Sequence, residues 1–289
     1  MGEGELVFET EGKEGRGVEN RDRQGEVVPV VKIEGKEIEV KRESTILEAA
    51  RRVGVWIPTL CYSPVLKSTG SCRICMVEVS SGGRKRLVTA CNYPVRGDLE
   101  VEVNGGRAER VRRGVMELLL ARSPGSEELK ELAERMGVKG TRYPKVTESQ
   151  RDCILCGLCV SVCEEVIGCS AIGYAGRGVD RVVATPFRLA SEECIACGAC
   201  AAVCPVGTIQ VRIHEDSGEA EISPFKSRAK LLRCEGCGKR MVTEPVGAKV
   251  FKELKIDWEE FRSRARLCPE CRREKAAESM MVGTGVKKG

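Results

Sequence analysis

Two copies of one four-cysteine run constrain this chain more than any other feature of its sequence. The runs are Cys153-x2-Cys156-x2-Cys159-x3-Cys163 and Cys194-x2-Cys197-x2-Cys200-x3-Cys204-Pro205. Eight thiols at this spacing are typical of two [4Fe–4S] clusters, and they indicate a chain that conducts electrons. A disulfide framework is the alternative, but two identical runs in a chain of 289 residues argue against it.

The two runs resemble those of two-cluster ferredoxins, in which the fourth cysteine of each run binds the other cluster. The resemblance implies that one cluster is bound by Cys153, Cys156, Cys159 and Cys204. The other cluster would then be bound by Cys194, Cys197, Cys200 and Cys163. Pro205 also fits that pattern, whereas Glu164 takes the equivalent place after Cys163. This departure is mild, because the proline shapes the backbone and is not a ligand.

The composition suits several small modules that metal ligation stabilises. The 17 cysteines lie in four blocks, while aromatic residues make up 4% of the chain and charged residues 31%. Small modules with so little apolar material gain much of their folding free energy from metal ligation. The chain has room for two or three domains, and we expect an α+β protein.

Charge and targeting signals narrow the class of protein further. The net charge of +5 comes from Lys and Arg residues interspersed with Glu, which is unlike a nucleic-acid footprint. No signal peptide is visible, and no run approaches the roughly 18 apolar residues that a membrane-spanning helix needs. We therefore expect a soluble protein of the reducing cytoplasm, where dense thiols indicate metal ligation.

The N-terminal part has the order of a β-grasp ferredoxin. Residues 1–27 are rich in Gly, Glu and Arg, and are expected to be disordered. In the predicted domain 28–106, alternating hydrophobic residues on both sides of a Glu-Gly turn predict a β-hairpin. Ser44 is then expected to cap a short helix that ends at Gly54.

Four cysteines follow in this domain: Cys61, Cys72, Cys75 and Cys91. Plant-type ferredoxins use C-x4-C-x2-C with a distant fourth ligand, so the wider first gap here is a variant of that pattern. Gly70 allows the backbone before Cys72 to turn its N–H groups toward the cluster sulfurs. A structural zinc site is the alternative, but the asymmetric loop after a hairpin and helix favours [2Fe–2S].

Three segments resemble a known family: Gly70-Ser-Cys-Arg-Ile-Cys-Met-Val-Glu-Val79, Thr89-Ala-Cys91-Asn and Arg112-Arg-Gly-Val-Met-Glu-Leu-Leu-Leu120. They are similar to the N-terminal part of the large iron–sulfur subunit of respiratory complex I. They also resemble the diaphorase-side iron–sulfur subunit of soluble NAD-linked [NiFe]-hydrogenases. Subunits of NAD-linked formate dehydrogenases and of multimeric [FeFe]-hydrogenases are similar too. The resemblance runs from about Val28 to Val211.

One departure from the family is informative. Its members commonly place a His and three Cys after the helix to hold a further [4Fe–4S] cluster. Here no Cys lies between Cys91 and Cys153, and the only His is His214. That cluster is therefore expected to be absent. Residues 107–144 are expected to form a helical linker before a two-cluster domain at 145–214.

The last cysteines form two Cys-x2-Cys pairs: Cys234, Cys237, Cys268 and Cys271. They predict a four-cysteine module at 228–275, followed by a tail at 276–289. Two such pairs with a helical insert describe a ribbon-like zinc site that is closed and redox-inert. A further [4Fe–4S] cluster and a rubredoxin-type iron are alternatives. Thiol–disulfide exchange lacks the expected βαβ pattern.

Two residues fall outside these patterns. Cys169 has no ligand partner in spacing and is expected to be a buried small residue. His214 lies at a predicted strand end without a neighbouring carboxylate–serine or cysteine constellation, and is expected to have no special role.

No catalytic residues are predicted. The chain has neither G-x-G-x-x-G after a strand nor G-x4-G-K-[ST], and it lacks a plausible nucleophile–base set. The resemblance implies an electron-transfer subunit between an NAD(P)H-linked flavin subunit and a terminal metalloenzyme, with a hydrogenase favoured over a formate dehydrogenase. Electron bifurcation is compatible with this role. A free-standing ferredoxin-like carrier and an iron–sulfur redox sensor are the alternatives.

Overall fold

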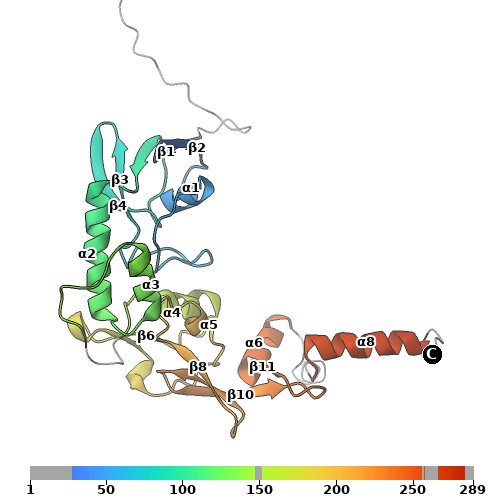
Figure 1. Cartoon of the computed structure of the whole chain (residues 1–289). Helices are drawn as coiled ribbons and strands as arrows, with labels where there is room; N and C mark the ends of the chain where they lie inside the picture. The colour runs from blue at the N-terminus through green and yellow to red at the C-terminus, as the bar shows by residue number, and fades with distance from the viewer. Residues whose placement is uncertain (1–27, 147–151, 256, 258–265, 284–289) are drawn as a thin grey trace, which may run out of the picture.

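The computed structural model describes residues 28–146, 152–255, 257 and 266–283. The expected disorder of residues 1–27 and the end of the predicted tail lie outside the described residues. Figure 1 shows the N-terminal sheet and the double cysteine repeat at opposite ends of one long helix, with the C-terminal helices to one side. In the described ranges, no helix has the length and apolar character needed to cross a membrane.

Five short strands form the N-terminal sheet. They are β1 (Val30–Ile33), β2 (Lys36–Glu39), β3 (Met76–Ser81), β4 (Arg84–Thr89) and β5 (Leu99–Glu102). Their order is β2-β1-β5-β3-β4, with β1 and β5 parallel and the other neighbours antiparallel. Alternation along β1 buries Val31 and Ile33 completely, so one face of the sheet carries the core.

Helix α1 (Ile46–Arg52) buries Leu47 and Ala50 in the core of this sheet. The prediction that Ser44 caps it was wrong, because Thr45 is the N-cap. The Thr45 hydroxyl accepts from Glu48 N at 3.2 Å, and the Glu48 carboxylate accepts from Thr45 N at 2.8 Å. Such a capping box needs an acidic or amide residue three positions after the cap. Thr45 has Glu48 at this position, whereas Ser44 has Leu47.

Two helices follow the sheet, α2 (Gly106–Arg122) and α3 (Glu127–Arg135). Met116 of α2 and Leu129 of α3 have no exposed surface, and they lie in one core with residues from both cysteine regions. The helix pair therefore does more than connect two domains, because its side chains form one hydrophobic core with residues from both cysteine regions.

The double cysteine repeat folds mostly as loops with short elements. These are α4 (Leu158–Ser161), the π-helical turn η2 (Val162–Val166), β6 (Gly173–Ala175), the 3-10 turn η3 (Gly178–Asp180), β7 (Val182–Ala184), the 3-10 turn η4 (Pro186–Arg188) and α5 (Ala199–Ala202). Gly157 and Gly198 cap α4 and α5 with φ of 86° and 77°. Glycine favours this conformation because it has no Cβ, so each run can turn sharply into its helix.

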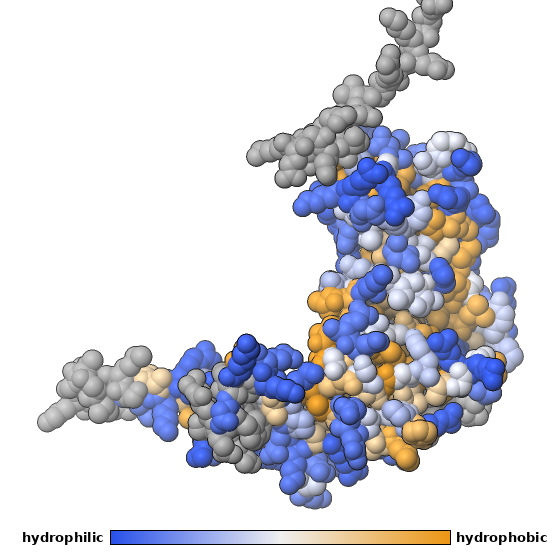
Figure 2. Space-filling view, turned by 180° about the vertical axis from the view of Figure 1, so that it is seen from behind, coloured by the Kyte–Doolittle hydropathy of each residue, from blue (hydrophilic) through white to orange (hydrophobic). Residues whose placement is uncertain are grey.

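A second sheet follows the repeat: β8 (Gln210–His214), β9 (Glu219–Ser223), β10 (Ser227–Arg233) and β11 (Arg240–Thr243). These strands are antiparallel in the order β11-β10-β9-β8, and helices α6 (Glu244–Glu253) and α8 (Pro269–Gly283) follow. Ile222 and Phe225 pack in one core with Ile172 and Ala196. The strands thus begin at the end of the predicted two-cluster domain (145–214) and continue into the predicted four-cysteine module (228–275). Figure 2 shows a mostly hydrophilic surface over the C-terminal region and orange, hydrophobic areas nearer the middle of the molecule.

Candidate cluster and metal sites

The four N-terminal cysteines Cys61, Cys72, Cys75 and Cys91 are all buried. The first three lie on the loop between α1 and β3, and the last follows β4. Cys72 N donates to Cys61 Sγ at 3.4 Å, which is the kind of backbone contact that the loop before Cys72 was expected to provide. Gly70 has a φ of 66°, and a Cβ there would lie 2.9 Å from Asn92 Nδ2. The loop is therefore packed tightly over the strand that leads to Cys91.

The four N-terminal thiols interact in pairs. A hydrogen bond between the thiols of Cys72 and Cys61, together with burial, holds the pKa of Cys72 far above its ordinary value. A hydrogen bond with Cys91 lowers the pKa of Cys75 instead. The sulfurs are thus close enough to share protons when no metal is bound, as expected for a set of thiolate ligands.

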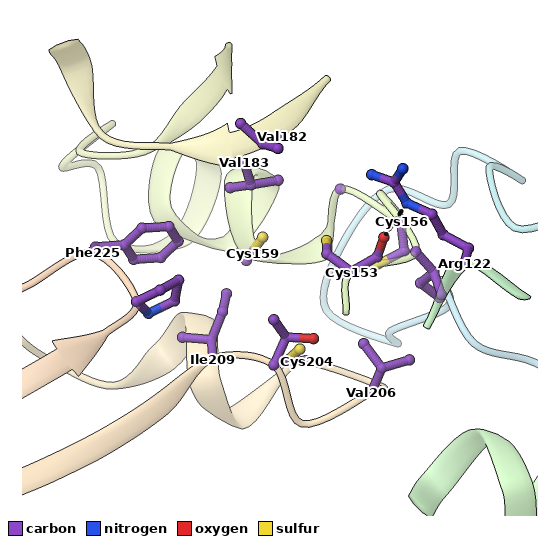
Figure 3. A pocket seen from close by; sticks show the side chains of 14 residues that line it. Arg122, Cys153, Cys156, Cys159, Val182, Val183, Cys204, Val206, Ile209 and Phe225 are labelled. Carbon is purple, nitrogen blue, oxygen red and sulfur yellow. Dashed lines mark hydrogen bonds between the residues drawn. The ribbon is translucent and has the colours of Figure 1, made fainter. Parts of the chain in front are cut away.

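Cys153, Cys156, Cys159 and Cys204 line one cavity, which we call the first cavity (Figure 3). Its other walls are largely apolar and include Val183, Ile209 and Phe225. Burial raises the pKa of Cys156 to about 12 and also raises that of Cys159. Thiolates in such a place need a positively charged partner, and an iron–sulfur core supplies one.

Cys163, Cys194, Cys197 and Cys200 line another cavity, the second cavity. Cys204 therefore lies with the first run, and Cys163 lies with the second. This is the crossed grouping that the resemblance to two-cluster ferredoxins implies. Phe225 lines both cavities, so a single ring lies at their boundary. The second cavity is nearer to solvent, since Cys197 is exposed whereas Cys156 and Cys159 are buried.

Cys169 differs from its expectation as a buried packing residue. It is half-buried and lines the second cavity beside the four cysteines of that site. Its amide donates to Cys163 O at 2.9 Å, so the chain turns back on itself after η2 and brings Cys169 to the cavity. Spacing could not reveal this position, because the turn runs through the left-handed residue Gly168, whose φ is 69°.

The four C-terminal cysteines form a compact group. The sulfurs of Cys234, Cys237, Cys268 and Cys271 all lie within 4.8 Å of one another. Cys237 Sγ is 3.7 Å from Cys268 Sγ, and Cys268 N donates to Cys234 Sγ at 3.2 Å. Backbone donors, first that of Cys268, lower the pKa of Cys234 to about 6. Cys234 is therefore prepared to present a thiolate, whereas hydrogen bonds with the other thiols of the group, first that of Cys237, raise the pKa of Cys271.

The spacing of the sulfurs separates this site from those upstream. A tetrahedral ion with metal–sulfur bonds of about 2.3 Å holds its ligands about 3.8 Å apart. In the described part of the chain, only the C-terminal cysteines form a group of three or more candidate ligands this compact. The described upstream cysteines do not form a group of this compactness.

The loop of Cys61 and the first cavity are neighbours. Leu60, Cys61 and Leu66 belong to the same buried cluster as Ile154 and Cys156. Thus the N-terminal site lies beside the first cavity, and the first cavity adjoins the second across Phe225. The three sites form a continuous series.

His214 has a carboxylate neighbour within the second sheet. Its Nε2 lies 3.0 Å from Glu221 Oε2, and Arg228 Nε donates to the same oxygen at 2.6 Å. Burial would raise the pKa of Glu221, but these bonds lower it overall. The group ties together the strands β8, β9 and β10 and contacts none of the candidate ligands.

Comparison with known proteins agrees with the series of sites. Residues 30–106 match a 2Fe-2S iron-sulfur cluster binding domain, and residues 152–208 match a 4Fe-4S dicluster domain. A crystal structure of an NAD+-reducing [NiFe]-hydrogenase is 29% identical with a TM-score of 0.48, covering 54% of this chain and 74% of that one.

Several curated proteins are similar in sequence. The G 2 subunit of NADH-quinone oxidoreductase from Rhizobium meliloti is 32% identical over 82% of this chain and 30% of its own length. The NADP-reducing hydrogenase subunit HndD of Solidesulfovibrio fructosivorans is 36% identical over 55% of this chain and 32% of its own. The NADPH-Fe(3+) oxidoreductase subunit alpha of Geobacter sulfurreducens is also 36% identical, over 53% and 20%. The chain thus spans a third or less of the length of these relatives. It contains a 2Fe-2S domain and a 4Fe-4S dicluster domain, and it is related to HndD and to this NADH-quinone oxidoreductase subunit.

Proposed function

We propose that this chain is a subunit that relays single electrons between an NAD(P)H-linked flavoprotein and a terminal catalytic subunit. The observation that carries the proposal is the continuous series of three four-cysteine sites, joined by a shared core and by Phe225. Bound iron–sulfur clusters supply one-electron chemistry, which divides a two-electron hydride transfer at a flavin into single steps. The residues of this chain fix the spacing, burial and hydrogen bonding of those clusters.

The proposed ligands follow the three groups of cysteines. Cys61, Cys72, Cys75 and Cys91 would hold [2Fe–2S] in a domain whose mixed sheet and single helix support a β-grasp fold. The first cavity would hold one [4Fe–4S] cluster through Cys153, Cys156, Cys159 and Cys204. The second would hold another through Cys194, Cys197, Cys200 and Cys163.

For the C-terminal site we propose zinc in a structural, ribbon-like module. The close approach of the four sulfurs supports a single tetrahedral ion and argues against a cubane. The backbone donors to Cys234 and Cys268 suit zinc and a rubredoxin-type iron equally. Metal analysis of the purified chain distinguishes these two ions.

The partners are proposed from the names of the relatives. Each is a subunit of an oxidoreductase named for NADH, NADPH or NADP, and one is a hydrogenase subunit. These names favour a hydrogenase as the terminal enzyme, in a complex of the reducing cytoplasm. A free-standing carrier or a redox sensor would be isolated without partners. Recovery of this chain as a monomer, without flavoprotein or metalloenzyme, would contradict the proposal.

The order of the series gives a direct test of the relay. We place the N-terminal site toward the flavin subunit and the two cavities toward the terminal enzyme. Replacing Cys72 with Ser is expected to stop NAD(P)-coupled turnover of the complex and to spare the dye-linked activity of the terminal enzyme. The matched control Ser71→Ala changes an exposed neighbour and should alter neither activity. An equal loss of both activities in Cys72→Ser would show that this order is wrong.

A further inference from the structure

The last residue of α2 reaches the first cavity. Arg122 Nε donates to Cys153 O at 3.1 Å, and Arg122 Nη2 donates to Arg181 O at 3.3 Å. Figure 3 shows its side chain beside Cys153 and Cys156, at one end of the cavity. Two backbone carbonyls thus hold the guanidinium in place, and one of them belongs to a proposed cluster ligand.

The charge on Arg122 sets the first cavity apart. Among the described residues that line this cavity, Arg122 is the one with a charged side chain. The described lining of the second cavity contains no charged side chain. Lys249 approaches the second site outside that lining, with its Nζ 3.6 Å from where a Cβ on Gly168 would lie. The two sites therefore differ in the cation that the protein supplies to them.

Neighbouring acids do not cancel this difference at the cavity wall. Asp152 precedes Cys153, but its carboxylate accepts a hydrogen bond from Gly125 N at 3.1 Å and does not line the cavity. Glu128 accepts from the hydroxyl of Ser126 at 2.8 Å and is also outside the lining. The charge of Arg122 also opposes the rise in the pKa of Cys153 that burial causes.

A fixed cation changes the free energy of reduction of a nearby cluster. Arginine stays protonated at every physiological pH, and its charge is felt strongly where burial lowers the local dielectric constant. Reduction adds one negative charge to the cluster, so a neighbouring cation makes the reduced form more stable. Cluster potentials respond to net charge in their surroundings in this way.

We propose that Arg122 tunes the first cavity, raising the reduction potential of its [4Fe–4S] cluster relative to the one in the second cavity. The proposal rests on the crossed ligand sets of the proposed function. When an electron is shared, one electron leaves one site and enters the other, and no bond or proton moves. Arg122 is thus a tuning residue. It shifts the electron-sharing equilibrium toward reduction of the cluster in the first cavity, which lies between the other two sites of the series.

Redox titration of the full chain, reconstituted with iron and sulfide and followed by electron paramagnetic resonance, tests this role. The signal that disappears in Cys156→Ala identifies the first cavity. Arg122→Met is expected to move that signal to a more negative potential and to leave the other cubane signal in place. The expected change is at least tenfold in the electron-sharing equilibrium, which is about 59 mV for one electron.

Matched variants separate charge from structure. Arg113→Met removes another α2 arginine, whose partner is Glu109 at 3.6 Å, and should leave both potentials unchanged. Arg122→Lys keeps the charge and should stay closer to the unmodified chain than Arg122→Gln. Equal potentials for the Lys and Gln variants, or an equal shift of both cubane signals, would overturn the proposal. These potentials are measured without partners, so they are independent of a failure of the relay proposal.

Discussion

The first cavity and the C-terminal cysteine group both contain four thiols, but the pKa of one thiol in each is shifted in opposite directions. In the first cavity, burial raises the pKa of Cys156 to about 12, and the walls are largely apolar. In the C-terminal group, backbone donors lower the pKa of Cys234 to about 6. The first arrangement depends on its cofactor to stabilise thiolates, whereas the second presents a thiolate before any metal arrives.

The two regions also differ in what supports them. The first cavity stands on the core that contains Met116 and Leu129, both without exposed surface. At the C-terminal group, the exposed Cys237 and the half-buried Cys271 accompany two buried cysteines. Burial suits a redox centre because it excludes water and fixes the surrounding charges, while a structural ion needs only its ligands. The difference predicts distinct responses to substitution in the two regions.

The largest expected effect is loss of a whole cluster from the first cavity. The intact chain should contain about ten iron atoms, two in [2Fe–2S] and eight in the two cubanes. Cys156→Ala is expected to lower this by about four, measured as iron per chain after reconstitution. Cys169→Ala is the matched control, because Cys169 lines a cavity but belongs to neither proposed ligand set. If Cys156→Ala kept its iron, Cys156 would not be a ligand.

The next effect should be confined to the C-terminal group. Cys268→Ala is expected to remove about one zinc per chain and to leave the iron content near ten, because this group shares no ligand with the upstream sites. Metal analysis by mass spectrometry measures both elements in one sample. A loss of about one iron instead of zinc would identify a rubredoxin-type centre, and a loss of about four irons would restore the cubane alternative.

The cysteine pattern predicted much of the sites because ligand spacing is a local property of the chain. The partition of Cys163 and Cys204 between two cavities is the one that the resemblance of the repeat to two-cluster ferredoxins implies. The contact of Arg122 with Cys153 O was not predictable in this way, because it joins residues 31 positions apart. The bond between His214 and Glu221 was missed because β8 and β9 were not recognised as paired strands.

One of the missed strands did carry a usable signal. Burial alternates along Ser227, Arg228, Ala229 and Lys230, as the sequence alternates small and charged residues. A sheet with one solvated face has this period of two. From the sequence alone, no neighbouring strand was identified that could pair with this stretch.

The core beneath the first cavity gives a smaller effect than ligand loss. Met116→Ala should lower the free energy of unfolding of this region by about 2–5 kcal/mol, because it leaves a cavity in a fully buried core. Thermal bleaching of the cluster absorbance reports the loss as a lower midpoint temperature. Leu118→Ala is the matched control on the same helix, since Leu118 is 53% exposed. Equal midpoints for the two variants would show that this core does not support the cluster sites.

The smallest expected effect concerns the attachment of the C-terminal region. Thr243 Oγ1 donates to Ile195 O at 2.7 Å, joining the end of β11 to the loop of the second cavity. Thr243→Val should cost about 1 kcal/mol, because it removes this hydrogen bond while preserving side-chain shape. Faster hydrogen–deuterium exchange in β11 and α6 would measure the loosening, and the exposed Val242→Thr is the control. Because the bond involves no proposed ligand, the iron and zinc contents should stay constant. A fall in zinc in Thr243→Val would instead mean that the C-terminal cysteine group depends on this attachment. It would contradict the view that this group, unlike the first cavity, needs only its own ligands.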